Sequence, residues 1–414
     1  MLEAGSKTKG WSTVAFGDVV QHVKDKVDPE ESGLERYVAG EHMDTDDLRI
    51  RRWGEIGNDY LGPAFHMRFK PGHVLYGSRR TYLRKVALAD FEGITANTTY
   101  VLQSKDPGVL LPELLPFIMQ TETFHEHSKR ESKGSVNPYV NFSDLAWYEF
   151  ALPPLAEQQR IVEALQASNG VANRLDLAAQ ELRLAKAAME VEVIAKPLGL
   201  SGGSLHLMKA EPTGDWQVLT GQDLIDQGYV TALQDGNHGS QYPRASELGT
   251  EGIPYIAASD ISDDGDIDLR CCKRIRPERA AKLRIAPAIT GDVILTHNAT
   301  VGRVTRLPEW PTEIVASTST TYYRCDPNRL DPDYLRWFFE SAVFQLQLGT
   351  IMRQSTRNQV PITTQKRLLF AVPPLEHQQQ LAGLRAQFLL ARRAIRSRLG
   401  GARELNSVLL RAYS

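Results

Sequence analysis

Cysteine is scarce in this sequence, which has 3 Cys in 414 residues. Cys271 and Cys272 are adjacent and Cys325 is distant, so they form neither a disulfide framework nor the CxxC spacing of a zinc site. Long apolar runs are lacking as well: the first residues contain no signal-peptide core, and residues 109–119 are interrupted by two prolines and a glutamate. We therefore expect a protein of the reducing cytoplasm that is neither secreted nor membrane-spanning.

An excess of charge of one sign is also absent. The 48 Lys and Arg residues against 50 Asp and Glu give a net charge of −2, so any polyanionic partner must be bound by local patches. With 42% hydrophobic and 24% charged residues the composition is that of an ordinary globular protein, which excludes a largely disordered chain. The length suits about two to four domains.

Motifs of common enzymes are missing too. The sequence has no GxxxxGK[ST] phosphate loop, no HExxH zinc pair and no GxSxG elbow. Asn137-Pro138-Tyr139 lacks one proline of the Asn-Pro-Pro-aromatic segment of amino-methylating DNA enzymes, and we interpret it as a loop. The acidic stretch 260–268 (DISDDGDID) is interpreted as a solvated turn, because its twelfth position is Cys271 and not the Glu of a calcium loop.

What the chain does contain is an internal duplication. The segment 152–159 (LPPLAEQQ) returns 220 residues later as 372–379 (VPPLEHQQ). Smaller matches keep nearly the same offset and pair Val74-Leu75 with Ile294-Leu295, Thr98 to Tyr100 with Thr320 to Tyr322, Pro112 with Pro332, and Asn137 with Asn358. Such companions at near-constant spacing indicate two copies of one unit.

A long helix is predicted after each Pro-Pro, where a proline and an acidic residue suit the first turn. From Ile161 to Val193 and from Leu381 to Ala412, apolar and small residues are spaced alternately by four and three, the pattern of a coiled-coil seam. The second seam includes Arg398 and Leu405. Each helix of roughly 40 residues would span about 60 Å, which suits a spacer.

The segments before each Pro-Pro favour mixed structure, with short β runs at 74–76, 98–102, 293–295 and 319–323 and helices at 110–124 and 331–348. The predicted fold class is α+β: two similar mixed α/β domains, separated and joined by two long antiparallel coiled-coil helices in a pseudo-twofold repeat. The expected boundaries are a domain at 1–152, a helix at 153–197, a flexible linker at 198–211, a domain at 212–371 and a helix at 372–414.

Basic residues gather at corresponding places in the two copies. Six Lys or Arg and no acid lie between residues 68 and 85, and seven against one Glu lie between 270 and 284. Lys133 precedes Asn137, and Arg357 precedes Asn358. A single cluster of this kind is usually a solvated face, but recurrence in both copies favours phosphate contact by Lys and Arg and base contact by Arg and Asn. The second copy alone has the segment 235–243 (DGNHGSQYP). Its small residues suit close contact with a phosphate or a base edge, and they suit a tight turn without a partner equally well.

The duplicated chain, with a Pro-Pro-Leu-x-x-Gln-Gln entry to each long helix, resembles the specificity (S) subunits of type I restriction-modification systems. The segment DGNHGSQYP and the strand-like residues 291–298 (GDVILTHN) are similar to target-recognition domains of that family. Two features depart from the pattern: His377 replaces the usual Glu, and the first copy has no counterpart of DGNHGS. The two domains are therefore expected to contact DNA differently.

The resemblance implies that each domain reads one half of a bipartite double-stranded DNA target, while the helices set the gap and dock two methyltransferase (M) subunits. Restriction/translocase (R) subunits would join the complex. S-adenosylmethionine, ATP and Mg would be bound by these partner subunits. This chain would have no catalytic residue, metal or cofactor of its own. The predicted partner-binding residues on the helices are Pro154, Glu157, Gln158, Pro374 and Gln378. The predicted DNA-binding residues are Arg79, Arg80, Arg84, Lys85, Lys133, Asn137, Asn237, His238, Ser240, His297, Asn298, Arg303, Arg357 and Asn358.

Three alternatives remain open at the level of sequence. The chain could be a methyltransferase or nuclease with its own specificity region, against which the missing cofactor loop argues. It could be the specificity region of another DNA-modifying phage-defence system. It could also be a coiled-coil adaptor whose globular heads bind protein and not DNA.

Overall fold

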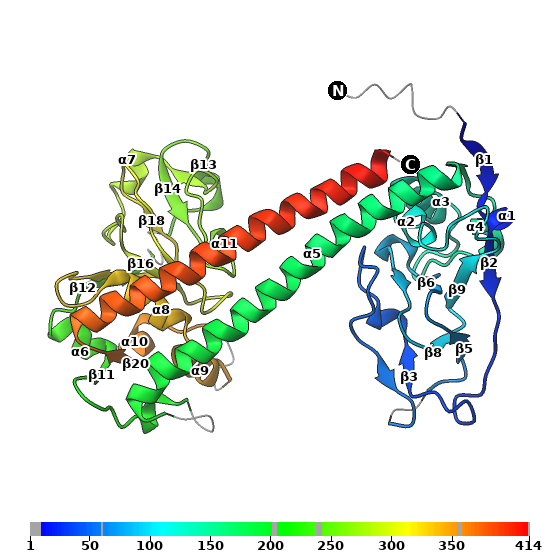
Figure 1. Ribbon diagram of the computed structural model, residues 1–414. Helices are drawn as coiled ribbons and strands as arrows, with labels where there is room; N and C mark the ends of the chain where they lie inside the picture. The colour runs from blue at the N-terminus through cyan, green and yellow to red at the C-terminus, as the bar shows by residue number, and fades with distance from the viewer. Residues whose placement is uncertain (1–9, 59–60, 201–204, 237–241, 354–357, 413–414) are drawn as a thin grey trace. The chain divides into compact units, whose positions relative to one another are not determined.

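The structure is a computed structural model that describes residues 10–58, 61–200, 205–236, 242–353 and 358–412. The chain divides into two compact units, one formed by residues 1–177 and 396–414 and the other by residues 178–395. Both boundaries fall inside long helices, so each unit contains a globular part and segments of two helices (Figure 1). Among the described residues, no helix combines the length and apolar character needed to cross a membrane.

Unit 1 contains two small sheets and a two-stranded ribbon. The sheets have the strand orders β2-β9-β6-β7 and β4-β3-β8-β5, and β1 pairs with β10. The strands are β1 (Ser12–Ala15), β2 (Val20–Val23), β3 (Arg36–Val38), β4 (Gly54–Glu55), β5 (Phe65–Phe69), β6 (Val74–Gly77), β7 (Val86–Leu88), β8 (Gly93–Ala96), β9 (Thr99–Ser104) and β10 (Glu149–Leu152). The helices are α1 (Phe16–Val19), α2 (Leu115–Ile118), α3 (Glu122–Arg130), α4 (Phe142–Ala146) and the first part of α5 (Leu155–Glu190).

The position of strand β6 between two cores explains why its sequence is a continuous apolar run. Val74 and Tyr76 face a core shared with the helices and the first turns of α5, whereas Leu75 faces the core between the two sheets. A strand covered on both faces needs apolar residues at every position and not an alternation. Helix α3 starts at Thr121, whose hydroxyl accepts a hydrogen bond from the Phe124 amide, the usual role of an N-cap threonine.

Unit 2 repeats this arrangement. Its sheets have the orders β12-β19-β16-β17 and β13-β15-β14-β18, and β11 pairs with β20. The strands are β11 (Gln217–Thr220), β12 (Val230–Asp235), β13 (Leu248–Gly249), β14 (Ile253–Ile256), β15 (Arg274–Ile275), β16 (Val293–Thr296), β17 (Val304–Arg306), β18 (Val315–Ala316), β19 (Thr320–Cys325) and β20 (Leu369–Val372). The helices are α6 (Gly221–Asp226), α7 (Pro277–Ala280), α8 (Pro332–Glu340), α9 (Ala342–Arg353) and α10 (Ile362–Gln365), with the second part of α5 and the first part of α11 (Leu375–Ala412), whose last turns belong to unit 1.

The strand registers confirm the duplication and correct its alignment by one residue. Leu75 lies between Ala87 and Val101 and faces the core between the two sheets of unit 1, and Ile294 lies between Thr305 and Tyr322 and faces the equivalent core of unit 2, whereas Leu295 faces the other core. Leu75 therefore corresponds to Ile294, whereas the sequence comparison pairs it with Leu295. Neighbouring valine, isoleucine and leucine residues look alike in sequence, and only the hydrogen-bond register distinguishes them.

The two long helices are confirmed, with one change in the second seam. Every predicted seam position from Ile161 to Met189 in α5, and Val193 in the π-helical turn that follows it, is buried or half-buried. In α11 Arg398 and Leu405 are exposed, and their neighbours Leu399 and Asn406 are half-buried instead. An α-helix has 3.6 residues per turn, so a strict alternation of four and three drifts off the contact face unless the helix supercoils.

A buried glutamine fixes the start of each long helix to its own domain. The Gln158 side chain accepts from the Leu111 amide at 2.9 Å and donates to the carbonyls of Val109 and Pro153, both at 2.8 Å. Gln378 makes the equivalent bonds, to the Asp331 amide and to the carbonyls of Arg329 and Pro373. Each glutamine is 1% exposed. The second Gln of the sequence motif is exposed in both copies.

The segment predicted as a flexible linker at 198–211 packs into unit 2 on both sides of residues 201–204, which lie outside the described residues. Leu198, Leu200 and Leu207 are buried in the main core of that unit. The Glu211 amide donates to the Leu198 carbonyl at 2.9 Å. Apolar side chains on both flanks of the glycines therefore attach this segment to the core.

Replacing Gln378 with Leu is expected to destabilise unit 2 by about 2–4 kcal/mol, because three main-chain groups at the helix start lose the hydrogen-bond partner that the buried amide provides. Urea unfolding of the full chain measures this as a lower transition midpoint. The matched control is Gln379→Leu at the exposed neighbour, which should change stability by less than about 0.5 kcal/mol. Equal midpoints for the two variants would contradict the assignment.

Candidate nucleic-acid interface

Two loops of unit 1 meet beyond the end of strand β6. The Val140 amide donates to the Ser78 carbonyl at 3.0 Å, and the Arg80 amide donates to the Pro138 carbonyl at 2.6 Å. The loop after β6 (78–84) thus runs beside the segment that precedes α4. These main-chain bonds place Arg79 and Arg80 next to Asn137, although the residues are far apart in sequence.

The second loop is a tight turn with an exposed tip. Lys133 and Tyr139 exchange two main-chain hydrogen bonds of 2.7 and 2.9 Å, and Gly134 supplies the positive φ of 89° that the turn requires. At the tip Val136 is 92% exposed and Asn137 is exposed. The Arg79 guanidinium lies over the Tyr139 ring at 5.8 Å, a cation–π arrangement that holds it at the surface.

Arg79, Arg80 and Asn137 are exposed and make no side-chain hydrogen bond or ion pair with other described residues. Arg80 has a left-handed backbone with φ of 48°, which is unusual for a side chain of its size. Strained conformations of this kind persist where the surrounding structure enforces them, often at functional sites. We define these three residues, with Tyr139, as the unit 1 reading surface.

Unit 2 has the same junction beyond strand β16. The Val360 amide donates to the His297 carbonyl at 2.8 Å, and the Ala299 amide donates to the Asn358 carbonyl at 3.1 Å. Ala299 has a φ of 63° at the position equivalent to Arg80. Asn298, half-buried, and Asn358, exposed, lie at this junction, and we call them the unit 2 reading surface.

The hydrogen bonds also correct the predicted pairing of the two asparagines. The Asn358 carbonyl accepts the bond that Pro138 accepts in unit 1, so Asn358 corresponds to Pro138 and not to Asn137. Four predicted DNA-binding residues lie outside the described residues: Asn237, His238, Ser240 and Arg357.

Several predicted DNA contacts in unit 1 have partners inside the protein. Arg84 forms ion pairs with Asp46 at 2.7 Å and with Glu122 at 2.5 Å, and its guanidinium holds the pKa of Glu122 below the usual value. The Lys85 ammonium donates to the Gly40 carbonyl. These two side chains therefore hold the loop in place before any ligand is bound.

Lys133 is an intermediate case. Its ammonium contacts Asp144 at 2.8 Å, and this hydrogen bond lowers the pKa of the Asp144 carboxyl. The lysine side chain is nevertheless more than half exposed. A weak surface ion pair of this kind can be exchanged for a phosphate.

In unit 2 His297 is buried, and the half-buried Arg303 is bonded to neighbouring residues. His297 is 1% exposed and bonds to the Thr321 hydroxyl at 2.8 Å, so a direct DNA contact by this side chain is contradicted. Arg303 bonds to the Ile261 carbonyl at 2.8 Å and to Asp263. Arg303 and Lys85 occupy corresponding places and both tie the loop to a neighbouring carbonyl.

The basic run 270–284 is partly neutralised. Arg270 pairs with Asp268 at 2.9 Å, and Arg279 pairs with Glu247 at 2.7 Å. Arg274 lies over the Trp310 ring at 5.4 Å and donates to main-chain carbonyls. The run is therefore a weaker candidate for phosphate contact than its composition suggests.

The predicted partner-binding residues separate into two groups. Pro154 and Pro374 are exposed and Glu157 is half-buried, so a second chain could reach all three. Gln158 and Gln378 are buried and satisfied within the chain, as described above. A direct partner contact by these two glutamines is thus contradicted, because no surface of either side chain is available.

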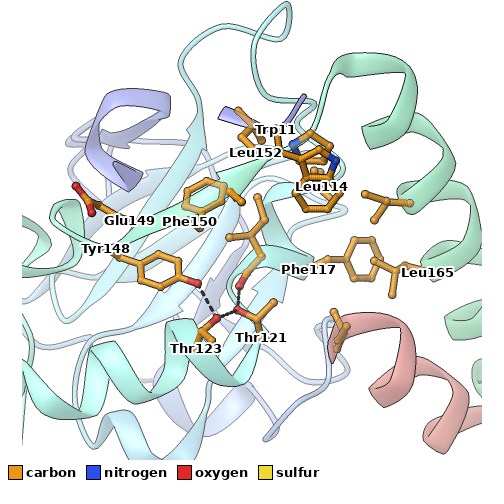
Figure 2. Close-up of a pocket in the computed structure, with 15 residues that line it drawn as sticks. Trp11, Leu114, Phe117, Thr121, Thr123, Tyr148, Glu149, Phe150, Leu152 and Leu165 are labelled. Carbon is orange, nitrogen blue, oxygen red and sulfur yellow. Dashed lines mark hydrogen bonds between the residues drawn. The ribbon is translucent and has the colours of Figure 1, made fainter. Parts of the chain in front are cut away.

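A separate hollow in unit 1 has the opposite chemical character. It is an apolar pocket of about 260 Å³ where the domain meets α5, lined by Trp11, Leu114, Phe117, Phe150, Leu152, Ile161 and Leu165 among others. Figure 2 shows its polar edge, where the Thr123 hydroxyl bonds to the Tyr148 hydroxyl at 2.8 Å. The Thr123 hydroxyl also donates to the Thr121 hydroxyl at 3.3 Å, so these hydroxyl groups are engaged with one another.

Sequence reasoning missed the exposed Val136 and the left-handed Ala299. The glycine Gly134, which opens a short polar turn, was a signal in the sequence that the Val136 side chain would be exposed. No signal in the sequence marks the left-handed backbone of Ala299, because alanine rarely adopts this conformation.

Comparison with known proteins agrees with this geometry. Residues 8–175 match the family described as the type I restriction modification DNA specificity domain. The chain is 27% identical over 165 residues to the type I restriction enzyme EcoDI specificity subunit of Escherichia coli, which covers 40% of this chain and 36% of that protein. The match thus spans about a third of that relative's length.

Two solved structures extend the likeness to the whole chain. The type I restriction-modification system S subunit from M. genitalium has 14% identity and a TM-score of 0.62, covering 100% of this chain and 98% of that one. A chain from a study of complex assembly and conformational transition of the type I R-M system has 18% identity and a TM-score of 0.57, covering 98% of both chains. At this level of identity the two matches establish the fold.

The fold is therefore that of a duplicated α+β protein with two mixed domains and two long helices, as predicted. The predicted resemblance to the specificity subunits of type I restriction-modification systems is confirmed as a resemblance: residues 8–175 match the model of the DNA specificity domain, and a curated specificity subunit is similar over 40% of the chain.

A histidine that packs against the residues supporting the unit 1 reading surface makes the stability of this region depend on pH. The His22 ring packs on Tyr100 at 4.8 Å and on Phe142 at 5.1 Å, and the Tyr100 hydroxyl donates to the Val140 carbonyl at 2.8 Å. Burial, with a smaller contribution from Lys24, lowers the pKa of His22 from 6.5 to about 4. The neutral ring is thus the form that the fold accommodates.

Because the folded pKa lies below the unfolded one, the unfolded chain takes up this proton first, and stability falls as pH decreases from 6.5 to about 4. Titration of the His22 ring by NMR should give a midpoint near 4. In His22→Gln the decline of stability across this pH range should be smaller than in the wild type. A midpoint near 6.5 would show that the ring is solvated.

Proposed function

We propose that this chain is a DNA specificity subunit of a type I restriction-modification complex, in which each unit reads one part of a split DNA target. The observation that carries the proposal is the recurrence of one junction in both units. In each, a loop after the equivalent strand is hydrogen-bonded to the segment before a short helix, and Arg or Asn side chains lie at the surface. A recurring surface is difficult to explain as an incidental solvated face.

The side chains on the two surfaces suit DNA in different ways. Arg79 and Arg80 can neutralise phosphates or make paired hydrogen bonds to guanine, and Asn137 can pair with adenine in the major groove. Asn298 and Asn358 offer amides without a described cation beside them. The two units would therefore read different half-sites.

A near-neutral chain is compatible with this role. With a net charge of −2, the chain alone has little long-range attraction for DNA. Much of the salt-dependent affinity would come from two M subunits docked at the helix starts, where Pro154, Glu157 and Pro374 are accessible. In the cytoplasmic complex, these M subunits and R subunits would supply S-adenosylmethionine, ATP, Mg and all catalysis.

The first test is adenine-methylation mapping of a host genome with and without this gene. Loss of methylation at one split motif with a fixed gap is the expected result, because a specificity subunit alone defines the target. Complementation with the intact gene should restore the same motif. If the methylation pattern does not change, either another DNA modification or the adaptor role explains the chain better, and the proposal fails.

The second test concerns the unit 1 reading surface. Changing Arg79 and Arg80 to Glu should weaken DNA binding by the assembled complex at least about tenfold. The slope of log affinity against log salt should also fall, by roughly one for each phosphate that the variant no longer neutralises. The control is Lys70→Glu, an exposed cation that precedes β6 at the opposite end of the strand. Equal affinity and salt slope in all three complexes would remove Arg79 and Arg80 from the interface.

A further inference from the structure

In unit 1 an ion-pair network joins the domain to a long helix. The loop that follows β3 contains Asp47, Arg49 and Arg51, and both arginines bond to Asp176 of α5, at 3.3 and 3.4 Å. Arg403 of α11 contacts the same carboxylate at 3.3 Å. One helix carboxylate thus gathers three cations from two other parts of the unit.

Asp47 completes the network from the loop side. It contacts Arg49 at 3.1 Å and Arg51 at 2.7 Å, which orients both guanidinium groups towards the helix. The Asp47 and Asp176 side chains are each 22% exposed, so solvent screens these charges less than it screens a fully exposed pair. Networks of this kind fix geometry better than isolated surface pairs do.

In unit 2 the corresponding loop meets the helix with the opposite polarity. It belongs to the acidic stretch 260–268, and Asp264 accepts from Arg392 of α11 through its carboxylate and its carbonyl, both at 3.0 Å. Asp266 contacts Arg393 at 3.5 Å. The acidic stretch interpreted from sequence as a solvated turn is therefore part of a domain–helix contact.

The two contacts occupy equivalent places. Each loop follows the short 3₁₀ turn after the strand that pairs in parallel with β8 or β18. Counted from the equivalent buried glutamines, Asp176 is 18 residues along its helix and Arg392 is 14 along its own, which is about one turn apart on one face. The helix contributes the anion in unit 1 and the cation in unit 2.

We propose that these contacts are electrostatic clamps of opposite polarity that set the orientation of each recognition domain on its own helix. The inference rests on the proposed function, because orientation matters for reading only if the surfaces bind DNA. The clamps define where the two reading surfaces point, and Asp176, Arg392 and their partners act as positioning residues.

The reversed polarity also makes each domain specific for its helix. If the unit 1 loop were placed on the unit 2 helix, Arg49 and Arg51 would face Arg392 and Arg393. Like charges in contact would oppose that docking, so the sequence disfavours exchanged domain–helix pairs as well as favouring the native ones. A buried apolar contact alone could not discriminate in this way, because apolar surfaces carry no sign.

The experiment compares three forms of the full chain assembled with its partners. Asp176→Arg breaks the unit 1 clamp by adding a fourth cation. The triple variant Asp176→Arg, Arg49→Asp, Arg51→Asp restores opposite charges between loop positions 49 and 51 and helix position 176. Asp47 and Arg403 keep their charges, so the expected recovery is partial. The control is Glu181→Arg, the same charge change at an exposed helix position with no ion pair among the described residues.

Hydrogen exchange of loop amides 44–52 is the first measurement, because it reports docking without DNA. Exchange should rise at least about fivefold in Asp176→Arg, stay unchanged in Glu181→Arg, and return towards the wild-type rate in the triple variant. Loop amides 262–266 in unit 2 should not change. Unaltered exchange in Asp176→Arg, or no recovery in the triple variant, overturns the clamp.

Methylation of the split motif is the second measurement. It should fall at least about tenfold in Asp176→Arg and recover in the triple variant, because binding energy depends on placing both reading surfaces at once. If exchange responds as expected but the wild type methylates no split motif, the proposed function fails and the clamp stands. If the wild type methylates the motif and the broken clamp leaves it unchanged, the positioning role is refuted.

Discussion

The position of each long helix depends on one buried side-chain amide. Gln158 and Gln378 satisfy main-chain groups that would otherwise be orphaned where the domain chain turns into the helix. Because an amide both donates and accepts, it can bond at once to an N–H of the domain and to carbonyls on either side. The same geometry in both units means that each domain meets its own helix start in the same way.

On this fixed connection the two units carry similar scaffolds with different surfaces. The main-chain bonds beyond β6 and β16 are the same, whereas Arg79 and Arg80 are replaced by Asn298 and Ala299. Main-chain bonds do not depend on side-chain identity, so the junction tolerates such changes. A duplicated protein can thus vary the side chains at this junction without altering how it folds.

Charge is used in this chain for internal placement as much as for external contact. Arg84, Lys85 and Arg303 hold loops by bonds to neighbouring acids or carbonyls, and the clamps of Asp176 and Arg392 hold domains to helices. Cations engaged in this way are costly to withdraw for a phosphate. The cations that remain available for a phosphate are those without such partners. In the unit 1 reading surface these are Arg79 and Arg80.

The sequence by itself determined the duplication, the two long helices, the apolar strands and the family resemblance, since these depend on patterns that recur along the chain, such as LPPLAEQQ and VPPLEHQQ. It did not determine which polar residues face outward: His297 and Gln158 proved to be buried, and the acidic stretch at Asp264 proved to face a helix. It also placed Leu75 and Asn358 one residue away from their true counterparts. Only the tertiary structure decided these points, because hydrogen-bond register and ion pairing join residues that are far apart in sequence and leave no local periodicity.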